Sequence, residues 1–245
     1  MRVVNPYDAG FREARSAVGA SAVLADAEEF TSVADAVADC TLVIGTTAVG
    51  ERELHHSVRP LAESAKLMRK QIRGGNVALL FGSERVGLSN EELSHCHWLL
   101  RIPTRVEHRS MNLGQAVAIC MYELGRLAEE RTAGAHGRNS KPTSANPADG
   151  ATFESREADE RSRKVARQRA QKKTASAGDV ERITATLMEV LHGCGYLHAK
   201  SGKIPGEKVR RLLRRHNLTA NDADLWQSML GQIVWKLRND EGGEK

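Results

Sequence analysis

Three short segments of the chain combine glycine with small polar residues in a pattern that a hydrophobic core does not require. The first, residues 81–89, reads Phe-Gly-Ser-Glu-Arg-Val-Gly-Leu-Ser and follows a β-forming run. The second, residues 102–113, begins with Ile-Pro and ends with Ser-Met-Asn-Leu at the start of a helical pattern, where Ser110 is a candidate N-cap. The third, residues 45–48, reads Gly-Thr-Thr-Ala. Because glycine lets a backbone approach a ligand closely, these segments predict a small-molecule site built largely from main-chain groups.

Short, mostly apolar runs lead into all three segments. We predict buried strands at residues 3–4, 22–24, 41–44, 77–81 and 98–102. Amphipathic helical patterns lie between them or follow them, at residues 11–18, 33–37, after the candidate N-cap Ser89, and at 112–130. This alternation predicts a parallel sheet covered by helices on both faces, with a ligand at the carboxyl edge of its strands.

The three segments together resemble the SPOUT methyltransferases, and most closely the TrmJ-type tRNA 2′-O-methyltransferases. The resemblance rests on FGSERVGLSNEEL and IPTRVEHRSMNLGQAV, with GTTAV before them and VNP near the start, and it covers residues 3–130. It implies an α/β fold with a SPOUT-type, trefoil-knotted parallel sheet flanked by helices, plus a small C-terminal all-helical domain. Such a knot is an exception to the rule that protein chains do not thread their own loops.

The resemblance also implies a cofactor, S-adenosylmethionine (SAM), bound between three loops of the knot, and a homodimer. The positions that match the family's cofactor-binding residues are Thr46, Thr47, Ala48, Gly82, Ile102, Arg109, Ser110 and Met111, with Glu84, Gly87, Asn112 and Leu113 in support.

The implied reaction is methylation of a ribose 2′-hydroxyl, with the tRNA anticodon loop as the expected substrate. The sulfonium of SAM is already a good electrophile, so the enzyme must align the hydroxyl with the methyl group and assist its deprotonation. Ser110 is our candidate catalytic residue.

The sequence departs from the family pattern at its start. The family has a further strand and helix, carrying an Asn and a catalytic Arg, before the VNP segment. Met1 lies just ahead of that segment here, so we expect this unit to be missing and favour a start codon placed too late over a shortened relative. The family's Arg after the GTxA segment is also displaced, because Val49 follows Ala48 and the next arginine is Arg52.

Composition changes beyond residue 131. We predict a methyltransferase domain at 1–130, a flexible and then basic linker at 131–178, and a small helical domain at 179–240 whose helices pack around Trp226 and Trp235. The strongest candidate RNA-binding patch consists of Arg210, Arg211, Arg214 and Arg215, and the alternative is a solvated helix face.

The bulk properties fit a cytoplasmic protein. The 245 residues carry a formal charge of +5, and no apolar run approaches the ~20 residues of a membrane span. We expect the four scattered cysteines to be buried and reduced, and no metal at the histidine pairs 55–56 and 95/97. Two alternatives stay open at this point: a non-catalytic RNA-binding relative, and a methyltransferase that acts on ribosomal RNA.

Overall fold

The computed structural model describes residues 1–6, 19, 21–48, 55–105, 110–135, 173–197 and 204–240. Its strands are β1 (Arg2–Val4), β2 (Glu28–Phe30), β3 (Cys40–Thr46), β4 (Val58–Pro60), β5 (Asn76–Leu80) and β6 (Trp98–Arg101). Its helices are α1 (Ser21–Ala25), α2 (Val33–Ala36), α3 (Leu61–Ile72), α4 (Asn90–Ser94), α5 (Leu113–Ala135), α7 (Ala177–Gly193), α8 (Ile204–Arg215) and α9 (Ala220–Asp240).

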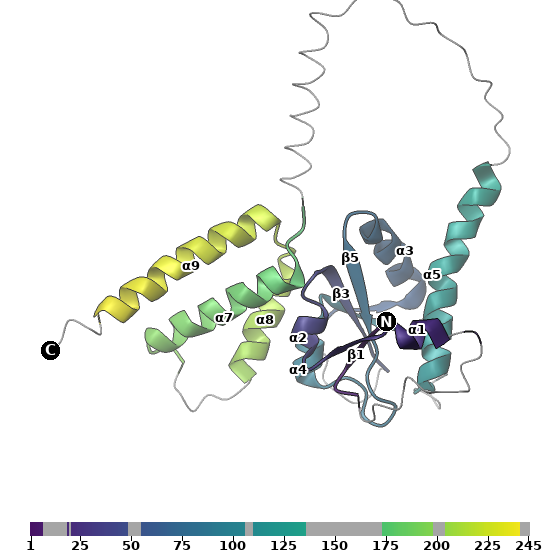
Figure 1. Cartoon of the computed structure of the whole chain (residues 1–245), viewed down its shortest axis with the longest axis horizontal. Coiled ribbons are helices and arrows are strands. Elements are labelled where there is room, and N and C mark those ends of the chain that lie inside the picture. The colour runs from purple at the N-terminus through teal and green to yellow at the C-terminus, as the bar shows by residue number, and fades with distance from the viewer. Residues whose placement is uncertain are drawn as a thin grey trace, which may run out of the picture.

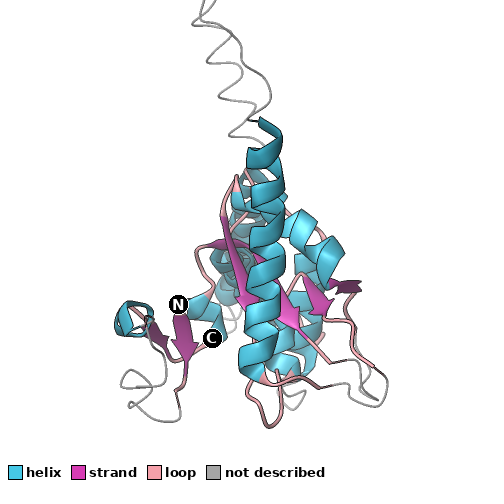
Figure 2. Cartoon of the chain, turned by 90° about the vertical axis from the view of Figure 1, so that its right-hand side faces the viewer, coloured by secondary structure: helices cyan, strands magenta, loops and turns pink. Residues whose placement is uncertain are grey.

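Four strands form a parallel sheet in the order β4-β6-β3-β5. The central strand β3 pairs with β5 on one side and β6 on the other, so that Ile44 lies opposite both Leu79 and Trp98. Strands β1 and β2 form a separate parallel pair, which lies to one side of the main sheet in Figure 2. The predicted parallel sheet is confirmed.

Side chains that alternate along β3 enter two different cores. Leu42 and Ile44 pack with residues of α3 and α5, whereas Val43 packs on the opposite face with residues of α2 and α4. Figure 1 shows α3 and α5 on one side of the sheet, and α2 and α4 on the side toward α7. Because a strand turns successive side chains to opposite faces, an uninterrupted apolar run such as β3 needs cover on both of them.

Several predicted elements differ from the structure. Residues 22–24 lie in helix α1, so the strand predicted there is wrong; three apolar residues alone do not separate a strand from one helical turn. Strands β2 and β4 were not predicted, because each has only three residues and includes charge or proline. Helix α5 continues to Ala135, past the predicted start of the linker at 131. The helix predicted at 11–18, and most of the predicted linker, lie outside the described residues.

The C-terminal helices α7, α8 and α9 enclose a core of their own. Its buried members are Ala175, Val180, Ile183, Leu213, Ala223 and Leu230. Trp226 and Trp235 are 37% and 67% exposed, so the prediction that they form this core is wrong. Smaller residues of α9, Ala223 and Leu230, face inward instead, and they allow α9 to pack closely along α7.

Cys40, Cys96 and Cys120 are buried and free, as predicted, but Cys194 is exposed at the end of α7. None of the described helices is both long and apolar enough to cross a membrane. Within the described ranges, no three His, Cys, Asp or Glu side chains come together as a potential metal site.

Candidate cofactor pocket

A pocket of about 350 Å³ lies where β3, β5 and β6 end, within the size range of small-molecule sites. Because the three strands are parallel, the segments that follow them meet at one edge of the sheet. Ten of the predicted site residues line this pocket: Thr46, Thr47, Ala48, Gly82, Glu84, Gly87, Ile102, Ser110, Met111 and Leu113. Arg109 lies outside the described residues, and Asn112 does not line the pocket but donates a hydrogen bond to Glu84, which does. Residues up to 67 positions apart in the sequence are thus brought together as predicted.

The turn after β5 is closed so tightly that glycine is required at its first position. A Cβ atom added to Gly82 would lie 2.1 Å from the carbonyl carbon of Gly87 and 2.3 Å from the nitrogen of Leu88. Gly87 itself has a φ of +69°, and its N–H donates to the Ser83 carbonyl at 2.9 Å. The two glycines therefore fold residues 82–88 into a compact loop that forms one wall of the pocket.

Hydrogen bonds join the ends of the three strands below the pocket. The Thr46 hydroxyl donates to the Leu80 carbonyl at 2.9 Å, which ties β3 to β5. The Thr47 N–H donates to the Leu100 carbonyl at 3.0 Å, which ties β3 to β6. These bonds hold the residues of the Gly-Thr-Thr-Ala segment in place at the pocket floor.

Glu84 links the loop after β5 to the start of α5. Its Oε1 accepts hydrogen bonds from Asn112 Nδ2 at 2.9 Å and from the Leu113 N–H at 3.4 Å. Asn112 in turn accepts from the Gln115 N–H through Oδ1 at 3.3 Å, so Asn112, and not Ser110 as predicted, caps helix α5. Ser110 is exposed and borders the pocket, which leaves its hydroxyl available to a ligand.

Replacing Glu84 with alanine is expected to lower the free energy of unfolding by about 1 kcal/mol, because it removes an acceptor that joins two loops. Urea denaturation would measure this. Glu63→Ala is the matched control, since Glu63 forms a half-exposed i,i+4 ion pair with Arg59 that should contribute at most about 0.5 kcal/mol. Equal losses in the two variants would contradict the linking role of Glu84.

The apolar part of the pocket was not predicted from the sequence. Its walls also include Phe81, Val86, Leu88, Leu93 and Leu100. All five lie within or beside the recognised segments, so strand position and proximity to the glycine loop could have identified them. Leu93 follows the loop in helix α4 and lines the pocket from there.

The predicted arginine patch is not one surface. Arg214 is 1% exposed, and the side chain of Arg210 is 16% exposed and bonded to Glu181, so both point into the protein. Arg211 is mostly covered beside Glu207, and Arg215 is exposed. For Arg210 and Arg214 the RNA-binding prediction is therefore wrong. Their negatively charged partner, Glu181, lies in helix α7, so the sequence pattern of α8 alone does not reveal it.

His95 and His97, two of the histidines considered as metal ligands, contact other parts of the fold. His97 Nδ1 lies 3.1 Å from the Val43 N–H and accepts a hydrogen bond from it. Burial lowers the pKa of His97 to about 3, and the charge of Arg214 acts in the same direction. Burial also lowers the pKa of His95 to about 4, with Arg210 adding to the effect and Glu181 opposing it. Both rings are thus neutral at physiological pH.

The part of the chain that forms the pocket also matches a known protein family. Residues 2–122 match the model of the SpoU rRNA Methylase family. This segment belongs to that family. The SPOUT resemblance, with its TrmJ-type motifs, is thereby confirmed.

Individual relatives match between half and most of the chain. A Haemophilus influenzae protein named uncharacterized tRNA/rRNA methyltransferase is 37% identical over 123 residues, which are 50% of this chain and 49% of the relative. A Sodalis glossinidius protein named tRNA (cytidine/uridine-2′-O-)-methyltransferase TrmJ is 29% identical over 215 residues, 88% of this chain and 72% of the relative. The chain spans about half the length of the first curated relatives that it matches.

A solved structure shows the same fold over most of the chain. The crystal structure of TrmJ from Z. mobilis ZM4 aligns with a TM-score of 0.68 at 24% identity, over 95% of this chain and 85% of that one. The alignment therefore includes the C-terminal helices as well as the sheet.

Proposed function

We propose that this protein is a SAM-dependent RNA 2′-O-ribose methyltransferase that acts on tRNA. The observation that carries the proposal is the convergence of the three SPOUT-type segments on one pocket at the carboxyl edge of the sheet. The names of the relatives support both the reaction and the substrate, since they include tRNA (cytidine/uridine-2′-O-)-methyltransferases. Both relatives described above are named as methyltransferases, which favours the enzyme over the RNA-binding alternative.

The lining of the pocket suits SAM. Apolar walls at Phe81, Leu88 and Leu100 can cover an adenine ring, while the threonines of residues 46–47 offer polar contacts. SAM supplies the electrophilic methyl group when it is bound. What the chain itself must do is hold the ribose hydroxyl in line and keep the pocket walls fixed.

We assign to Ser110 the contact with the ribose hydroxyl or its adjoining phosphate. Ser110 stands at the pocket edge, immediately before the capped start of α5. We expect Ser110→Ala to lower kcat/KM for RNA by about tenfold to a hundredfold, since one oriented polar contact to the reacting group is lost. SAM affinity should fall much less.

Initial-rate measurements with varied RNA, combined with calorimetry of SAM binding, would test this role. Ser83→Ala is the matched control: Ser83 also lines the pocket, but its hydroxyl accepts a hydrogen bond from the Val86 N–H within the loop. A normal kcat/KM in Ser110→Ala would contradict the assignment.

We also propose three further features that the family resemblance implies. Residues 2–122 carry the trefoil knot, the protein acts in the cytoplasm, and two copies of the chain assemble. The exposed apolar side chains Ile119, Met121 and Tyr122 on α5 are consistent with an additional protein contact. Arg215 keeps its proposed role in RNA binding, because its side chain is exposed.

A transfer assay tests the function itself. Purified protein is incubated with SAM labelled in the methyl group and with total tRNA, and acid-insoluble label is counted. We expect incorporation into RNA and none into DNA of matching sequence, which lacks the 2′-hydroxyl. Label in both nucleic acids would contradict ribose methylation.

A further inference from the structure

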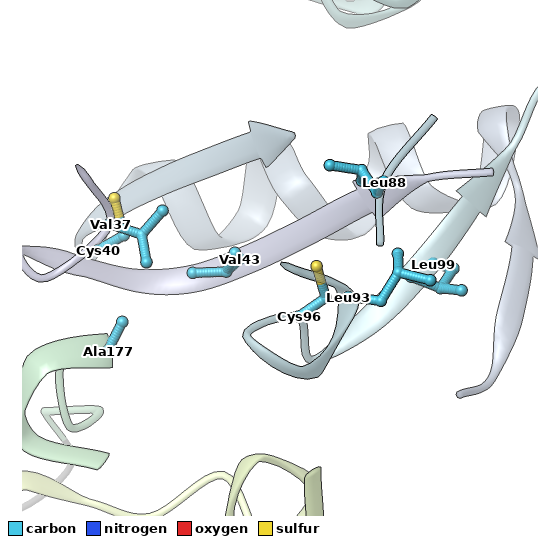
Figure 3. Close-up of a cluster of buried hydrophobic side chains, with 8 residues drawn as sticks. All are labelled: Val37, Cys40, Val43, Leu88, Leu93, Cys96, Leu99 and Ala177. Carbon is cyan, nitrogen blue, oxygen red and sulfur yellow. The ribbon is translucent and has the colours of Figure 1, made fainter. Parts of the chain in front are cut away.

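The C-terminal helices form part of the cover of the sheet. Ala177, the first residue of α7, belongs to the same buried cluster as Val43, Leu93 and Leu99 of the methylase segment (Figure 3). The Gly178 N–H donates to the Ala38 carbonyl at 2.9 Å, and a Cβ on Gly178 would lie 3.0 Å from that oxygen. Backbone therefore meets backbone where α7 touches the end of α2, so this contact has a defined geometry.

A network of charged side chains stabilises the same contact. Glu181 of α7 binds Arg210 of α8 through both carboxylate oxygens, at distances of 2.7 to 3.1 Å. Arg210 also donates through Nη1 to the Ser94 hydroxyl of α4 at 2.8 Å. Ser94 is fully buried and His95 lies within 3.6 Å of Glu181, so α4 is held directly by this ion pair.

The network contains one more cation, which makes Glu181 essential to it. Arg214 is 1% exposed, lies 3.9 Å from Glu181 and donates to the Ala177 carbonyl at 3.2 Å. Burial lowers the pKa of Arg214 to about 10, and Glu181 opposes this effect. Without Glu181, the buried guanidinium of Arg214 and the partly buried one of Arg210 would lose the carboxylate that both of them contact.

Helix α4 connects this network to the pocket. The helix has only five residues, and its N-cap Ser89 directly follows the loop that forms one pocket wall. Leu93 lines the pocket and also packs in the cluster that includes Ala177. A shift of α4 would therefore move Leu88 and Leu93 at the pocket wall.

We propose that Glu181 and Arg210 are positioning residues for the cofactor pocket: they fasten the C-terminal helices to α4 and thereby hold the wall formed by Leu88 and Leu93. The proposal rests on the proposed function in one respect, namely that the pocket takes SAM. It gives the C-terminal helices a role in cofactor affinity that is separate from RNA capture.

The test compares two glutamates of the same helix. Glu181→Gln breaks the fastening, whereas Glu189→Gln breaks an exposed ion pair with Arg238 that lies within the C-terminal helices. Ser94→Ala is a milder variant, which removes the contact to α4 without leaving an unpaired charge and is used in case Glu181→Gln folds poorly. Amide hydrogen exchange over residues 88–99 is measured without cofactor, and SAM affinity by calorimetry.

We expect about tenfold faster exchange over residues 88–99 and about tenfold weaker SAM binding in Glu181→Gln, with a smaller change of the same sign in Ser94→Ala and none in Glu189→Gln. Unchanged exchange in both Glu181→Gln and Ser94→Ala would overturn the proposal. Failure of the full chain to bind SAM would count against the proposed function instead, because the exchange measurement needs no cofactor.

Discussion

Alanine in place of Gly82 is expected to weaken SAM binding by about a hundredfold and to abolish measurable methyl transfer. The added Cβ would lie 2.1 Å from the backbone of Gly87 and 2.3 Å from that of Leu88, where no flexible side chain can yield. The loop of residues 82–88 must open to admit it, and overpacking of this kind costs about 1–3 kcal/mol. Since that loop is a pocket wall, we expect the cost to appear as lost affinity.

Calorimetry with SAM measures this effect directly, and a second glycine provides the control. A Cβ at Gly125, within helix α5, would meet no atom within 4 Å apart from its chain neighbours and the backbone of its own helix. Gly125→Ala should therefore bind SAM normally and gain up to about 1 kcal/mol in stability. Normal SAM affinity in Gly82→Ala would show that the ligand does not use this wall.

Acid is expected to begin to destabilise the protein below pH 6.5, before most carboxylates are protonated. The pKa of His95 is lowered by burial from its usual 6.5 to about 4, and that of His97 to about 3. His56 is shifted in the same direction by burial, beside Arg211 and Arg215. As pH falls from 6.5 toward 4, the unfolded chain takes up protons that the folded chain refuses, so stability is lost in this window.

The expected slope is at most about 1.4 kcal/mol per pH unit for each histidine. Urea denaturation at pH 7.5, 6.5, 5.5 and 4.5 would give it. His95→Gln removes one titrating group. The slope of the variant between pH 6.5 and 4.5 should therefore be smaller by up to about 1.4 kcal/mol per pH unit, whatever the stability of the variant at pH 7.5. A free energy of unfolding that stays constant from pH 6.5 to 4.5 would contradict the buried, neutral state of these rings.

The parts of the fold that sequence predicts well are those whose local pattern and burial agree. Residues 41–44 are β-branched or apolar without interruption, and β3 is the most deeply buried strand described. The capping box at Ser89, with Glu92 returning a hydrogen bond, is likewise a local signal that the structure confirms. Strand β2 gives no such signal, because two of its three residues are exposed glutamates at the edge of a two-stranded pair.

Residues whose role depends on distant partners were predicted least well. Arg210 and Arg214 look like a solvent-facing basic patch until α7 supplies Glu181 and α4 supplies Ser94. Trp226 and Trp235 have the size of core residues, yet the inward face of α9 is taken by Ala223 and Leu230. The pocket was predictable for a different reason: parallel strands deliver their carboxyl ends to one edge, whatever their order in the sheet.

The most direct test of the central claim is to determine which atom of RNA receives the methyl group. Protein is incubated with tRNA and SAM that carries a deuterated methyl group, the RNA is digested to nucleosides, and the products are separated by mass spectrometry. We predict the heavy methyl group on the ribose, as a 2′-O-methylated nucleoside, with no product from Gly82→Ala. Heavy methyl found on a base, or equal product from Gly82→Ala, would contradict ribose methylation at this pocket.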